Sequence, residues 1–380
     1  MKDLLELAEE LFLRPMPGKI GEMKQRRART NGVEGEEKAL NDDYEKKRKG
    51  KEEEEKFECR LVKYEALPDY LKDNEFILDY YRSEWPLKET FLSVFLWHNE
   101  TLNIWTHLGG FFLFLGLTIM NLMEINVVGQ HISTSSGAVA ESLMKNISHS
   151  FFSEHQASHI LEDQALTLTS KPVTFTRVPR WPWFVFLGGA MVCLSFSSIT
   201  HLLHSHSRRA NFFFWALDYT GISTMILSSF FPAIYYAFFC HPTLQLFYLS
   251  TISLIGLITV VTLTSPSLSS PRFRPLRGGL FLGMGFWGLI PAVHAIIINW
   301  GHSDSLMGHA YETVMALAYA TGAGIYMSRI PERWRPGAFD IAGHSHQIFH
   351  VFVIVGALAH YTAMRVLMDW RDGGATCLLQ

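Results

Sequence analysis

Histidine, serine and aspartate side chains recur near the predicted ends of three long apolar segments. Ser197 and His201 are spaced i,i+4, so they share one face of a helix. His346 and His350 show the same spacing at the start of the last apolar segment, and Asp218 lies about two turns inside another. Two imidazoles at i,i+4 can both bind one zinc ion. The pattern therefore predicts a metal centre in which His201 supplies a third nitrogen.

The predicted ligands also indicate what such a metal centre could do. Three neutral imidazoles leave the double charge of zinc uncompensated, and a nearby Asp218 carboxylate would cancel one unit of it. Three protein ligands and one water are typical of catalytic zinc sites, at which the water ionises near pH ~7. We therefore predict that Asp218 accepts the proton of the water, and that Ser197 hydrogen-bonds the water or a developing oxyanion.

Simpler interpretations of the same residues remain open from the sequence alone. A single histidine in an apolar helix is usually a hydrogen-bonded packing residue, and a single aspartate is often a counter-ion or part of an ion pathway. The spacing does not choose His201 over His204, and it does not exclude His206 or His344. The other histidines near or within the apolar segments are interpreted as structural: His98, His107, His294, His309 and His360.

Seven segments of about 20 mostly apolar residues could each cross a bilayer as a helix. The third contains Asp218 and the sixth contains Glu312, while the other segments contain no Asp, Glu, Lys or Arg. Helices of soluble proteins normally keep one polar face, and these segments do not. The sequence therefore predicts an all-α, seven-transmembrane helix bundle. The predicted spans are 104–123, 183–203, 212–238, 244–264, 279–299, 308–328 and 346–364.

The basic residues of the connecting loops predict the orientation of this bundle. Lys and Arg occur eight times in the loops 204–211, 265–278 and 329–345, but not at all in the loops 239–243 and 300–307. Short cytoplasmic loops carry the excess of Lys and Arg in membrane proteins. We therefore predict a cytoplasmic N-terminus and, because the number of spans is odd, a C-terminus that is outside or lumenal.

The composition divides the chain into four predicted regions. Residues 1–60 include the run KKRKGKEEEEK and are predicted to be a mostly disordered charged cytoplasmic extension. Residues 61–103 interleave aromatic and charged residues, as expected of an amphipathic cytoplasmic cap or juxtamembrane region. The seven-helix membrane domain covers 104–367, and 368–380 form a short outside tail. The N-terminus does not resemble a secretory signal, and the net charge of −3 gives no reason to expect nucleic acid.

The cysteines and two short motifs add little to this prediction. Cys59, Cys193, Cys240 and Cys377 lie far apart, so their spacing predicts neither a disulfide framework nor a cysteine-based metal site. The last four residues match a prenylation pattern. A lumenal tail would not meet the cytosolic prenylating enzyme, so we interpret this match as coincidence. The sequon at Asn146 is predicted to be lumenal and open to glycosylation.

The ordered motifs of the chain resemble the adiponectin- and progestin-receptor family, which includes bacterial haemolysin III-like proteins. The resemblance rests on SVFLWHNETLNIWTH at 93–107, SFSSITH ending at His201, LDYTGI around Asp218 and HSHQIFHVFVIVGALAHY at 344–361. LPDYLKDNEFILDYYR, WPWFVFLGG and RIPERWRPGAFD are similar to the plant heptahelical branch in particular. The similarity covers about residues 57–372.

This resemblance implies both a fold and a function. It implies seven helices with a cytoplasmic N-terminus, and zinc bound by His201, His346 and His350. It also implies that Asp218 is the water-linked acid and that Ser197 is the motif serine. A receptor-like signalling role in hormone, sugar or abiotic-stress responses follows from the plant branch. The animal members imply a ceramidase-like hydrolysis at the zinc site.

Alternatives of different classes remain open. A lipid hydrolase would act on a membrane lipid such as ceramide, whereas a signalling receptor would use zinc as a structural staple. A transporter is disfavoured because inverted repeats are not recognisable, although Pro232 and Pro291 are predicted to kink the third and fifth helices. The ligand is unknown, because the 125–180 loop departs from the animal receptors. Gly279 and Gly283 offer a small-residue surface for a homodimer. The N-terminal region could bind a cytoplasmic partner. We expect the protein in either the plasma membrane or the endoplasmic reticulum.

Overall fold

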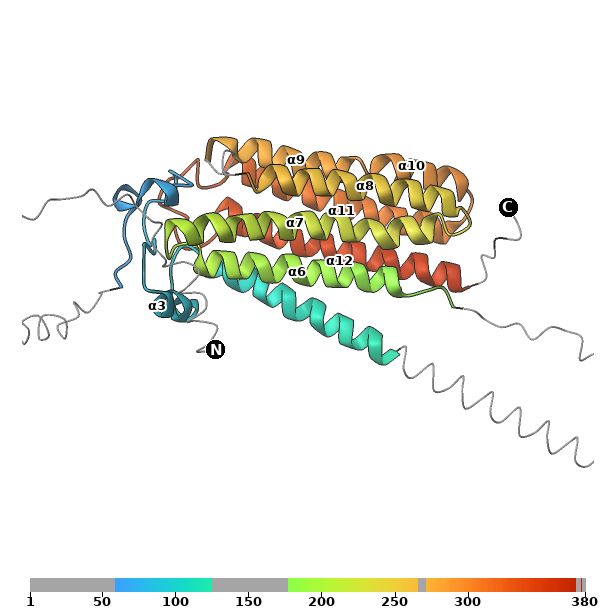
Figure 1. Cartoon of the computed structure of the whole chain (residues 1–380), viewed down its shortest axis with the longest axis horizontal. Coiled ribbons are helices and arrows are strands. Elements are labelled where there is room, and N and C mark those ends of the chain that lie inside the picture. The colour runs from blue at the N-terminus through green and yellow to red at the C-terminus, as the bar shows by residue number, and fades with distance from the viewer. Residues whose placement is uncertain (1–58, 125–176, 266–270, 374–376, 378–380) are drawn as a thin grey trace, which may run out of the picture.

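The computed structural model of this chain describes residues 59–124, 177–265 and 271–373, together with Cys377. Regular structure in these residues is helical, apart from one isolated antiparallel bridge. The long helices run along the long axis of the molecule and alternate in direction (Figure 1). The predicted all-α fold class is therefore confirmed for the described residues. The sequon at Asn146 and nearly all of the charged N-terminal extension lie outside them.

The helices fall into a long set and a short set. The long set is Thr101–Glu124, α6 (Trp181–Leu203), α7 (Arg208–Ala237), α8 (Pro242–Leu263), α9 (Arg274–Phe286), α10 (Leu289–Ile298), α11 (Ser303–Ser328) and α12 (Ser345–Asp372). The short set is η1 (Tyr64–Ala66), η2 (Asp69–Leu71), α3 (Leu87–Leu92), η3 (Ser93–Phe95) and η5 (Pro271–Phe273).

Each predicted span lies on a long helix or, for the fifth span, on α9 and α10 together. Five helical stretches of the described residues are long and apolar enough to cross a membrane: Thr101–Glu124, Trp181–Leu203, Pro242–Leu263, Pro275–Ile298 and Ser345–Asp372. The helices α7 and α11 are also long and contain Asp218 and Glu312 respectively, but they are not among these five stretches. That these two helices also cross the membrane stays a prediction.

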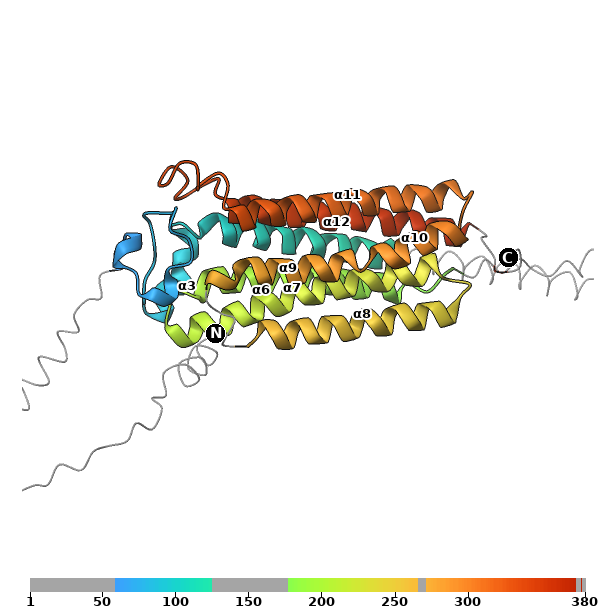
Figure 2. The same cartoon turned by 90° about the horizontal axis from the view of Figure 1, so that it is seen from above.

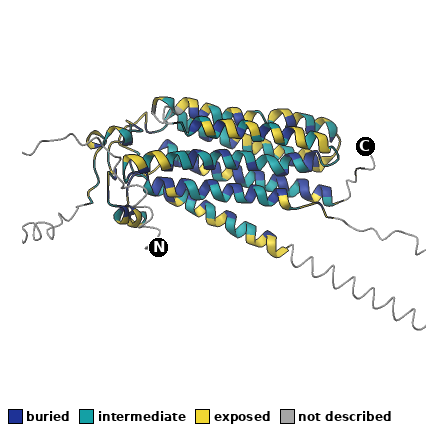
Figure 3. Ribbon diagram, in the orientation of Figure 1, coloured by how far each residue is buried: buried dark blue, intermediate teal, exposed yellow. Residues whose placement is uncertain are grey.

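The core of the bundle lies between the Thr101–Glu124 helix, α6, α7 and α12. Helix α6 packs along α7, and α11 packs along α12. The buried core side chains include Phe114, Trp183, Phe186, Leu194, Met225, Ala357 and Met364. Large apolar side chains on the outer faces of α8, α9 and α10 are exposed, as Figure 3 shows by its colours. This distribution suits a bundle that is surrounded by lipid, because exposed apolar surface is then not in contact with water.

Two glycines allow the paired helices to approach closely. A Cβ atom at Gly189 of α6 would lie 1.8 Å from Oγ of Ser228, and one at Gly356 of α12 would lie 2.4 Å from the ring of Tyr319. Small residues at helix contacts permit this close packing in membranes. A Cβ atom at Gly279 or Gly283 would meet nothing within 4 Å. The predicted homodimer surface at these two glycines therefore faces open space, and its use stays a prediction.

Proline affects the two predicted kink positions differently. Between α9 and α10 the helix is interrupted at Trp287 and Gly288. Pro291 explains the interruption, because its ring clashes with the carbonyl group four residues earlier, at Trp287. Pro232 lies inside α7, which continues past it as one helix to Ala237.

A cap covers the end of the bundle at which α6 ends and α7 and α12 begin (Figures 1 and 2). We define this cap as residues 59–100 and 329–344, and the covered end as the cap end. Its two segments are joined by hydrogen bonds. Gly337 N–H donates to the carbonyl oxygen of Phe76 over 3.0 Å, and Leu78 N–H donates to Oδ1 of the Asp340 side chain over 2.9 Å. The cap is therefore assembled from two parts of the chain that are distant in sequence.

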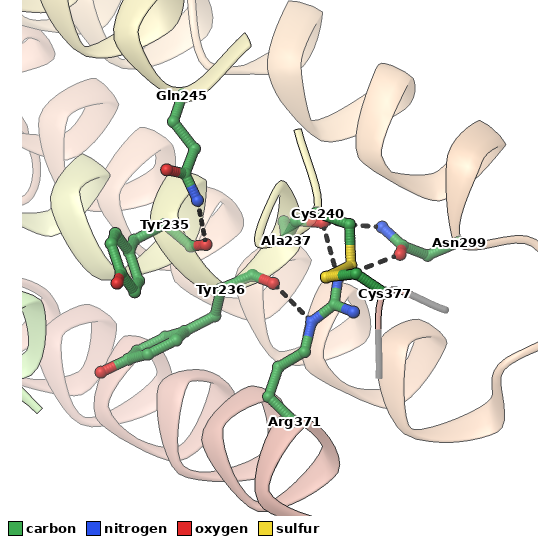
Figure 4. Close-up of a disulfide and its surroundings, with 8 residues drawn as sticks. All are labelled: Tyr235, Tyr236, Ala237, Cys240, Gln245, Asn299, Arg371 and Cys377. Atoms are coloured by element: carbon green, nitrogen blue, oxygen red, sulfur yellow. Dashed lines mark hydrogen bonds between the residues drawn. A yellow bond between two sulfur atoms is a disulfide. The ribbon is translucent and has the colours of Figure 1, made fainter. Parts of the chain in front are cut away.

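The opposite end, which we call the tail end, contains a disulfide bond that the cysteine spacing did not predict. Cys240 follows α7 and Cys377 follows α12, and the two are joined although 137 residues separate them (Figure 4). Their helices end side by side, which brings the two Cα atoms to 5.3 Å. The spacing of the cysteines could not predict this pair, because spacing along the chain does not encode proximity in the fold. A disulfide-bonded Cys377 has no free thiol for prenylation.

A buried arginine caps the C-terminal end of α7 beside the disulfide. Arg371 Nε donates to the carbonyl oxygen of Tyr236 over 2.7 Å, and Nη2 donates to that of Ala237 over 2.9 Å (Figure 4). Asn299 Oδ1 also accepts from Nη2 over 3.2 Å. A cation is favourable at the C-terminus of a helix, where carbonyl groups lack intrahelical partners. Arg371 therefore ties the last turn of α12 to the last turn of α7.

Candidate metal centre

Three imidazole rings meet inside the cap end. His201 lies in the last turn of α6, and His346 and His350 lie in the first two turns of α12. One ring nitrogen from each residue lies within 4.8 Å of the other two. The ring centroids are 4.7 to 4.9 Å apart, with interplanar angles of 71° to 87°. Ligand nitrogens around a tetrahedral zinc ion are about 3.4 Å apart, so small side-chain rotations would complete such a site.

The hydrogen bonds of His201 leave one nitrogen available for a metal. Its Nδ1 atom lies 2.7 Å from Oε2 of Glu100, whereas its Nε2 atom is buried and has no hydrogen-bond partner among protein groups. A neutral imidazole that donates through Nδ1 keeps a lone pair on Nε2. Metal-bound histidines commonly donate their other nitrogen to a carboxylate in this way. The protonation pattern that Glu100 selects therefore fits a cation beside Nε2.

The ring of His350 is oriented by the neighbouring Thr101–Glu124 helix. Its Nδ1 atom lies 3.2 Å from the carbonyl oxygen of Asn103 and 3.3 Å from Oγ1 of Thr106. The ring of His107 stacks on it, with centroids 3.6 Å apart and planes at 11°. A carbonyl oxygen at Nδ1 favours a proton there, so Nε2 is left as the ligand atom.

Arg82 of the cap fixes the end of α6 that carries His201. Its guanidinium donates to the carbonyl oxygens of His201 and Leu202 over 2.6 Å and 2.8 Å, and to Oγ of Ser93 over 2.6 Å. Burial lowers the pKa of Arg82 to about 10, so the group stays charged at neutral pH. A positive charge here complements the negative end of the helix dipole. The cap therefore holds the ligand-bearing turn of α6 in place.

Glu332 of the cap fixes the beginning of α12 in the complementary way. Its side chain is fully buried, and Oε2 accepts from the backbone N–H of Ser345 over 2.7 Å. The Ser345 hydroxyl also donates to Glu332, and Asn74 Nδ2 donates to it over 3.1 Å. A carboxylate is stabilising at a helix N-terminus. An anion and a cation from the cap thus hold the two helix ends that present the histidines.

Asp218 and Ser197 are buried together at the same end of the bundle. The Asp218 carboxylate interacts with the side chain of Ser197 and electrostatically with His201. Oδ1 of Asp218 has no hydrogen-bond partner among protein groups. Because Ser197 lies one turn before His201 on α6, the aspartate of α7 faces the helix surface that carries the ligand. The catalytic roles predicted for Asp218 and Ser197 stay predictions.

The three histidines that the spacing left open occupy different positions. Nε2 of His204 lies 3.6 Å from Oε1 of Glu100, so His204 belongs to a second possible metal-binding group with Glu100 and His201. His344 Nε2 lies 3.2 Å from the carbonyl oxygen of Asn99, and Nδ1 of His206 lies 2.8 Å from that of Trp85. Burial lowers the pKa of both His204 and His344. The geometry thus groups His201, rather than these three, with the histidines of α12.

Sequence reasoning missed two residues of this centre. Glu100, which orients His201, precedes the Thr101–Glu124 helix, whereas the apolar run predicted a helix beginning only at residue 104. The motif WHNETLNIWTH could have indicated Glu100. The polar residues around Glu100 in this motif made the predicted helix begin after its true first turn. Trp215 of α7 is the second residue that sequence reasoning missed. Its ring centroid lies 5.4 Å from that of His204 and 5.5 Å from that of His201.

The remaining histidines lie away from the centre or beside it. His107 stacks on His350, and His98 hydrogen-bonds the carbonyl oxygen of Ser93 within the cap. His294 contacts the Tyr248 hydroxyl group, and His309 contacts a carbonyl oxygen of its own helix. His360 of α12 forms a buried pair with Glu312 of α11, with Nδ1 2.7 Å from Oε1. His360 is in neither of the two metal-binding groups found among the described residues.

Comparison with known proteins shows which family and which relatives this chain is similar to. Residues 95–361 match the family described as haemolysin-III related. The chain is 50% identical to heptahelical transmembrane protein 3 of Arabidopsis thaliana over 321 residues, which cover 84% of this chain and 90% of that protein. It is also 50% identical to heptahelical transmembrane protein ADIPOR1 of Oryza sativa subsp. japonica, covering 83% and 86% of the two chains. The adiponectin receptor protein of Drosophila melanogaster is 34% identical over 84% of this chain and 62% of its own length.

Proposed function

This chain belongs to the haemolysin-III-related family, and we propose that it is a receptor-like heptahelical membrane protein whose zinc centre hydrolyses a lipid amide. Its apolar helices and its heptahelical relatives make it an integral, multi-pass membrane protein. The observation that carries the zinc proposal is the convergence of His201, His346 and His350, whose ring nitrogens lie within 4.8 Å of one another. The receptor-like role is supported by the names of the relatives.

In the proposed topology all seven spans cross the membrane, with the cap in the cytoplasm and the tail end outside or in a lumen. The basic loops 204–211, 265–278 and 329–345 support this orientation. The disulfide between Cys240 and Cys377 supports it independently, because disulfides persist in oxidising compartments and are rare in the cytosol. The plasma membrane and the endoplasmic reticulum each have an oxidising compartment on the non-cytoplasmic side, so the disulfide is compatible with both membranes.

The side chains around the centre have distinct roles in the proposed hydrolysis. His201, His346 and His350 would hold the zinc ion, which would supply Lewis acidity and an activated water. Asp218 accepts the proton that the attacking water loses, through the Oδ1 atom that has no protein partner. Ser197 interacts with that carboxylate and orients it in this proposal. Water adds to the amide carbonyl carbon, the C–N bond breaks, and the proton taken up by Asp218 passes to the leaving amine, while the acyl group leaves as a fatty acid.

The position of the centre favours a lipid as the substrate. His201 and His350 are buried at the ends of two apolar helices, and large apolar side chains on the outer surfaces of the bundle are exposed. A ceramide places its amide near the headgroup level while its chains extend into the bilayer. A ceramide or a related sphingolipid could therefore reach this depth with its amide close to the predicted proton acceptor.

The second candidate function is a signalling receptor in which zinc is purely structural. The specific observation in its favour is that the three histidines join α6 to α12, which are far apart in the sequence. A metal at this position would staple two helices whose ends the cap already holds. In this case removal of the metal lowers the thermal stability of the protein without the loss of any turnover.

Hydrolysis of ceramide by the purified full-length chain in lipid nanodiscs distinguishes the two functions. We expect the wild-type protein to release fatty acid, and His350→Ala to lose both zinc and release. Asp218→Asn should keep its zinc but lose about 10²- to 10⁴-fold in rate, the usual contribution of a general base. The matched control His360→Ala removes a buried histidine outside the centre and should keep both. A zinc-loaded wild-type protein without turnover would contradict the hydrolase and favour the structural role.

A further inference from the structure

The cap exposes a run of large apolar side chains just before the first long helix. The run is FLSVFLW at 91–97, which covers the end of α3, all of η3 and the two residues after it. It contains no charged residue, and five of its seven side chains are exposed. We define these five as the apolar rim: Phe91, Leu92, Phe95, Leu96 and Trp97. An exposed apolar patch of this kind commonly marks contact with a membrane or with another protein.

The same segment buries polar side chains in place of these apolar ones. Thr90, Ser93 and His98 are fully buried, whereas Phe95 and Trp97 are 77% and 65% exposed. A short helix at a water surface normally turns its apolar face toward the protein. The reversed arrangement is expected where the outer face meets acyl chains, as it does for helices that lie in the membrane interface.

Side chains of the following helix satisfy backbone carbonyl groups of this segment. Trp105 Nε1 donates to the carbonyl oxygen of Val94 over 2.9 Å, and Thr101 Oγ1 donates to that of Leu96 over 2.7 Å. A carbonyl group in contact with lipid needs such a partner, because no water is present there to donate a hydrogen bond. Neither carbonyl group therefore prevents this segment from facing lipid.

The apolar rim also continues an exposed apolar surface of the Thr101–Glu124 helix. Trp105 is exposed near the beginning of this helix, and Phe112 and Leu113 are exposed further along it. The helix is long and apolar enough to cross a membrane. Because Trp105 is bonded to Val94, the rim adjoins the point at which this surface begins, at the cap end (Figure 1). Tryptophan is typical of the boundary between membrane and water.

We propose that the apolar rim is a bilayer-contact surface, which lies at the boundary between headgroups and acyl chains in the leaflet on the cap side. The apolar face of an interfacial helix is buried about 5–10 Å into this boundary. The bilayer then extends past the first turn of the Thr101–Glu124 helix and reaches part of the cap. The proposal needs this helix to span the membrane, and it depends on neither zinc nor hydrolysis.

The bilayer-contact surface also indicates the depth of the candidate metal centre. Ser93, which lies within the rim segment, accepts a hydrogen bond from Arg82 over 2.6 Å. The same guanidinium donates to the carbonyl oxygen of His201 over 2.6 Å. One side chain therefore links the lipid boundary to the helix turn that presents His201, so the three-histidine centre lies near the headgroup level on the cap side.

The test measures the depth of spin labels on the full-length chain in lipid nanodiscs by electron paramagnetic resonance. Labels are attached to Phe95→Cys or Leu96→Cys in a Cys59→Ser background, since the other free cysteine, Cys193, is buried. Oxygen concentrates in lipid, whereas a charged nickel chelate stays in water. We expect the ratio of oxygen to nickel collisions to be several-fold higher at both rim positions than at Glu65→Cys, an exposed position of η1 in the cap.

A second control gives the value expected in lipid. Leu254→Cys labels an exposed position of α8, an apolar helix long enough to cross the membrane, and should give a high ratio. A ratio at either rim position as low as at Glu65→Cys would overturn the proposal, because the rim would then face water. Weak collisions with both reagents would also overturn it, since a protein surface such as a second copy of this chain would then cover the rim. Zinc content is measured separately, so failure of the metal centre is not confused with failure of this surface.

Discussion

The same histidine–carboxylate pair occurs in two regions of the bundle, one at the cap end and one further along α12. In both His201–Glu100 and His360–Glu312 the histidine Nδ1 atom lies 2.7 Å from a carboxylate oxygen. Both rings are at most 1% exposed, and in both the Nε2 atom has no partner among protein groups. The two pairs therefore share the same hydrogen-bond geometry and the same burial.

The surroundings of the two pairs differ. The ring centroid of His201 lies 4.7 Å from that of His346 and 4.9 Å from that of His350. The ring centroid of His360 instead lies 4.4 Å from that of Phe186, with the ring planes at 73°. A carboxylate can thus orient an imidazole in either setting, but a metal site also requires other ligands to converge on the free nitrogen. The distinguishing feature is the meeting of α6 with the first turns of α12.

Removal of the two carboxylates should give the largest contrast in zinc affinity. Glu100→Ala removes the acceptor that orients His201, and we expect a loss of about 10- to 100-fold, as is usual for partners of metal ligands. Glu312→Ala removes the equivalent acceptor of His360 and should leave zinc affinity unchanged. Competition with a zinc-binding dye measures both. An equal loss in the two variants would contradict the assignment of the metal to the cap end.

Arg82 and Arg371, which each bind carbonyl oxygens at a helix end, give the same comparison with a smaller effect. Arg82→Leu and Arg371→Leu each leave two helix-end carbonyl groups without donors, and each lost pairing should cost about 1–3 kcal/mol of stability. Only Arg82 supports the turn that carries His201, so only its loss should weaken zinc binding, by a few-fold. Thermal unfolding with and without zinc separates the two effects. Arg82→Lys keeps the charge and should recover part of the affinity.

Loss of the disulfide should have the smallest effect on the metal. The double variant Cys240→Ser, Cys377→Ser releases the constraint at the tail end, and disulfides typically contribute about 2–4 kcal/mol. We expect a lower unfolding temperature and unchanged zinc affinity, measured on the same preparation. A clear fall in zinc affinity would mean that the two ends of the bundle are coupled, which the separate networks described above do not predict.

The sequence predicted the helices best where hydropathy alone determines them. Five of the seven predicted spans lie on helices that are apolar enough to cross a membrane. The other two, α7 and α11, contain Asp218 and Glu312 along with serine, threonine and glycine, so their surroundings in the bundle matter as much as their composition. Hydropathy could not have shown that Glu312 pairs with His360, because the two lie on different helices.

The candidate site was predictable where two residues share one helix. The i,i+4 spacing placed His346 and His350 on one face, and the antiparallel order of the spans placed His201 at the same end. Glu100 was missed because the polar residues around it moved the predicted start of the helix past it. Arg82 and Glu332 could not have been found, because they act on helix ends through tertiary contacts and lie in segments without any periodic pattern.

The zinc content of three purified full-length proteins tests the central claim most directly. In preparations that have not met a chelator, we predict a single zinc ion per chain in the wild-type protein and in His360→Ala, and almost none in His346→Ala. Both variants remove a histidine from α12, so they differ mainly in whether the lost ring belongs to the three-histidine group. Equal zinc contents in the two variants, whether high or low, would contradict the account.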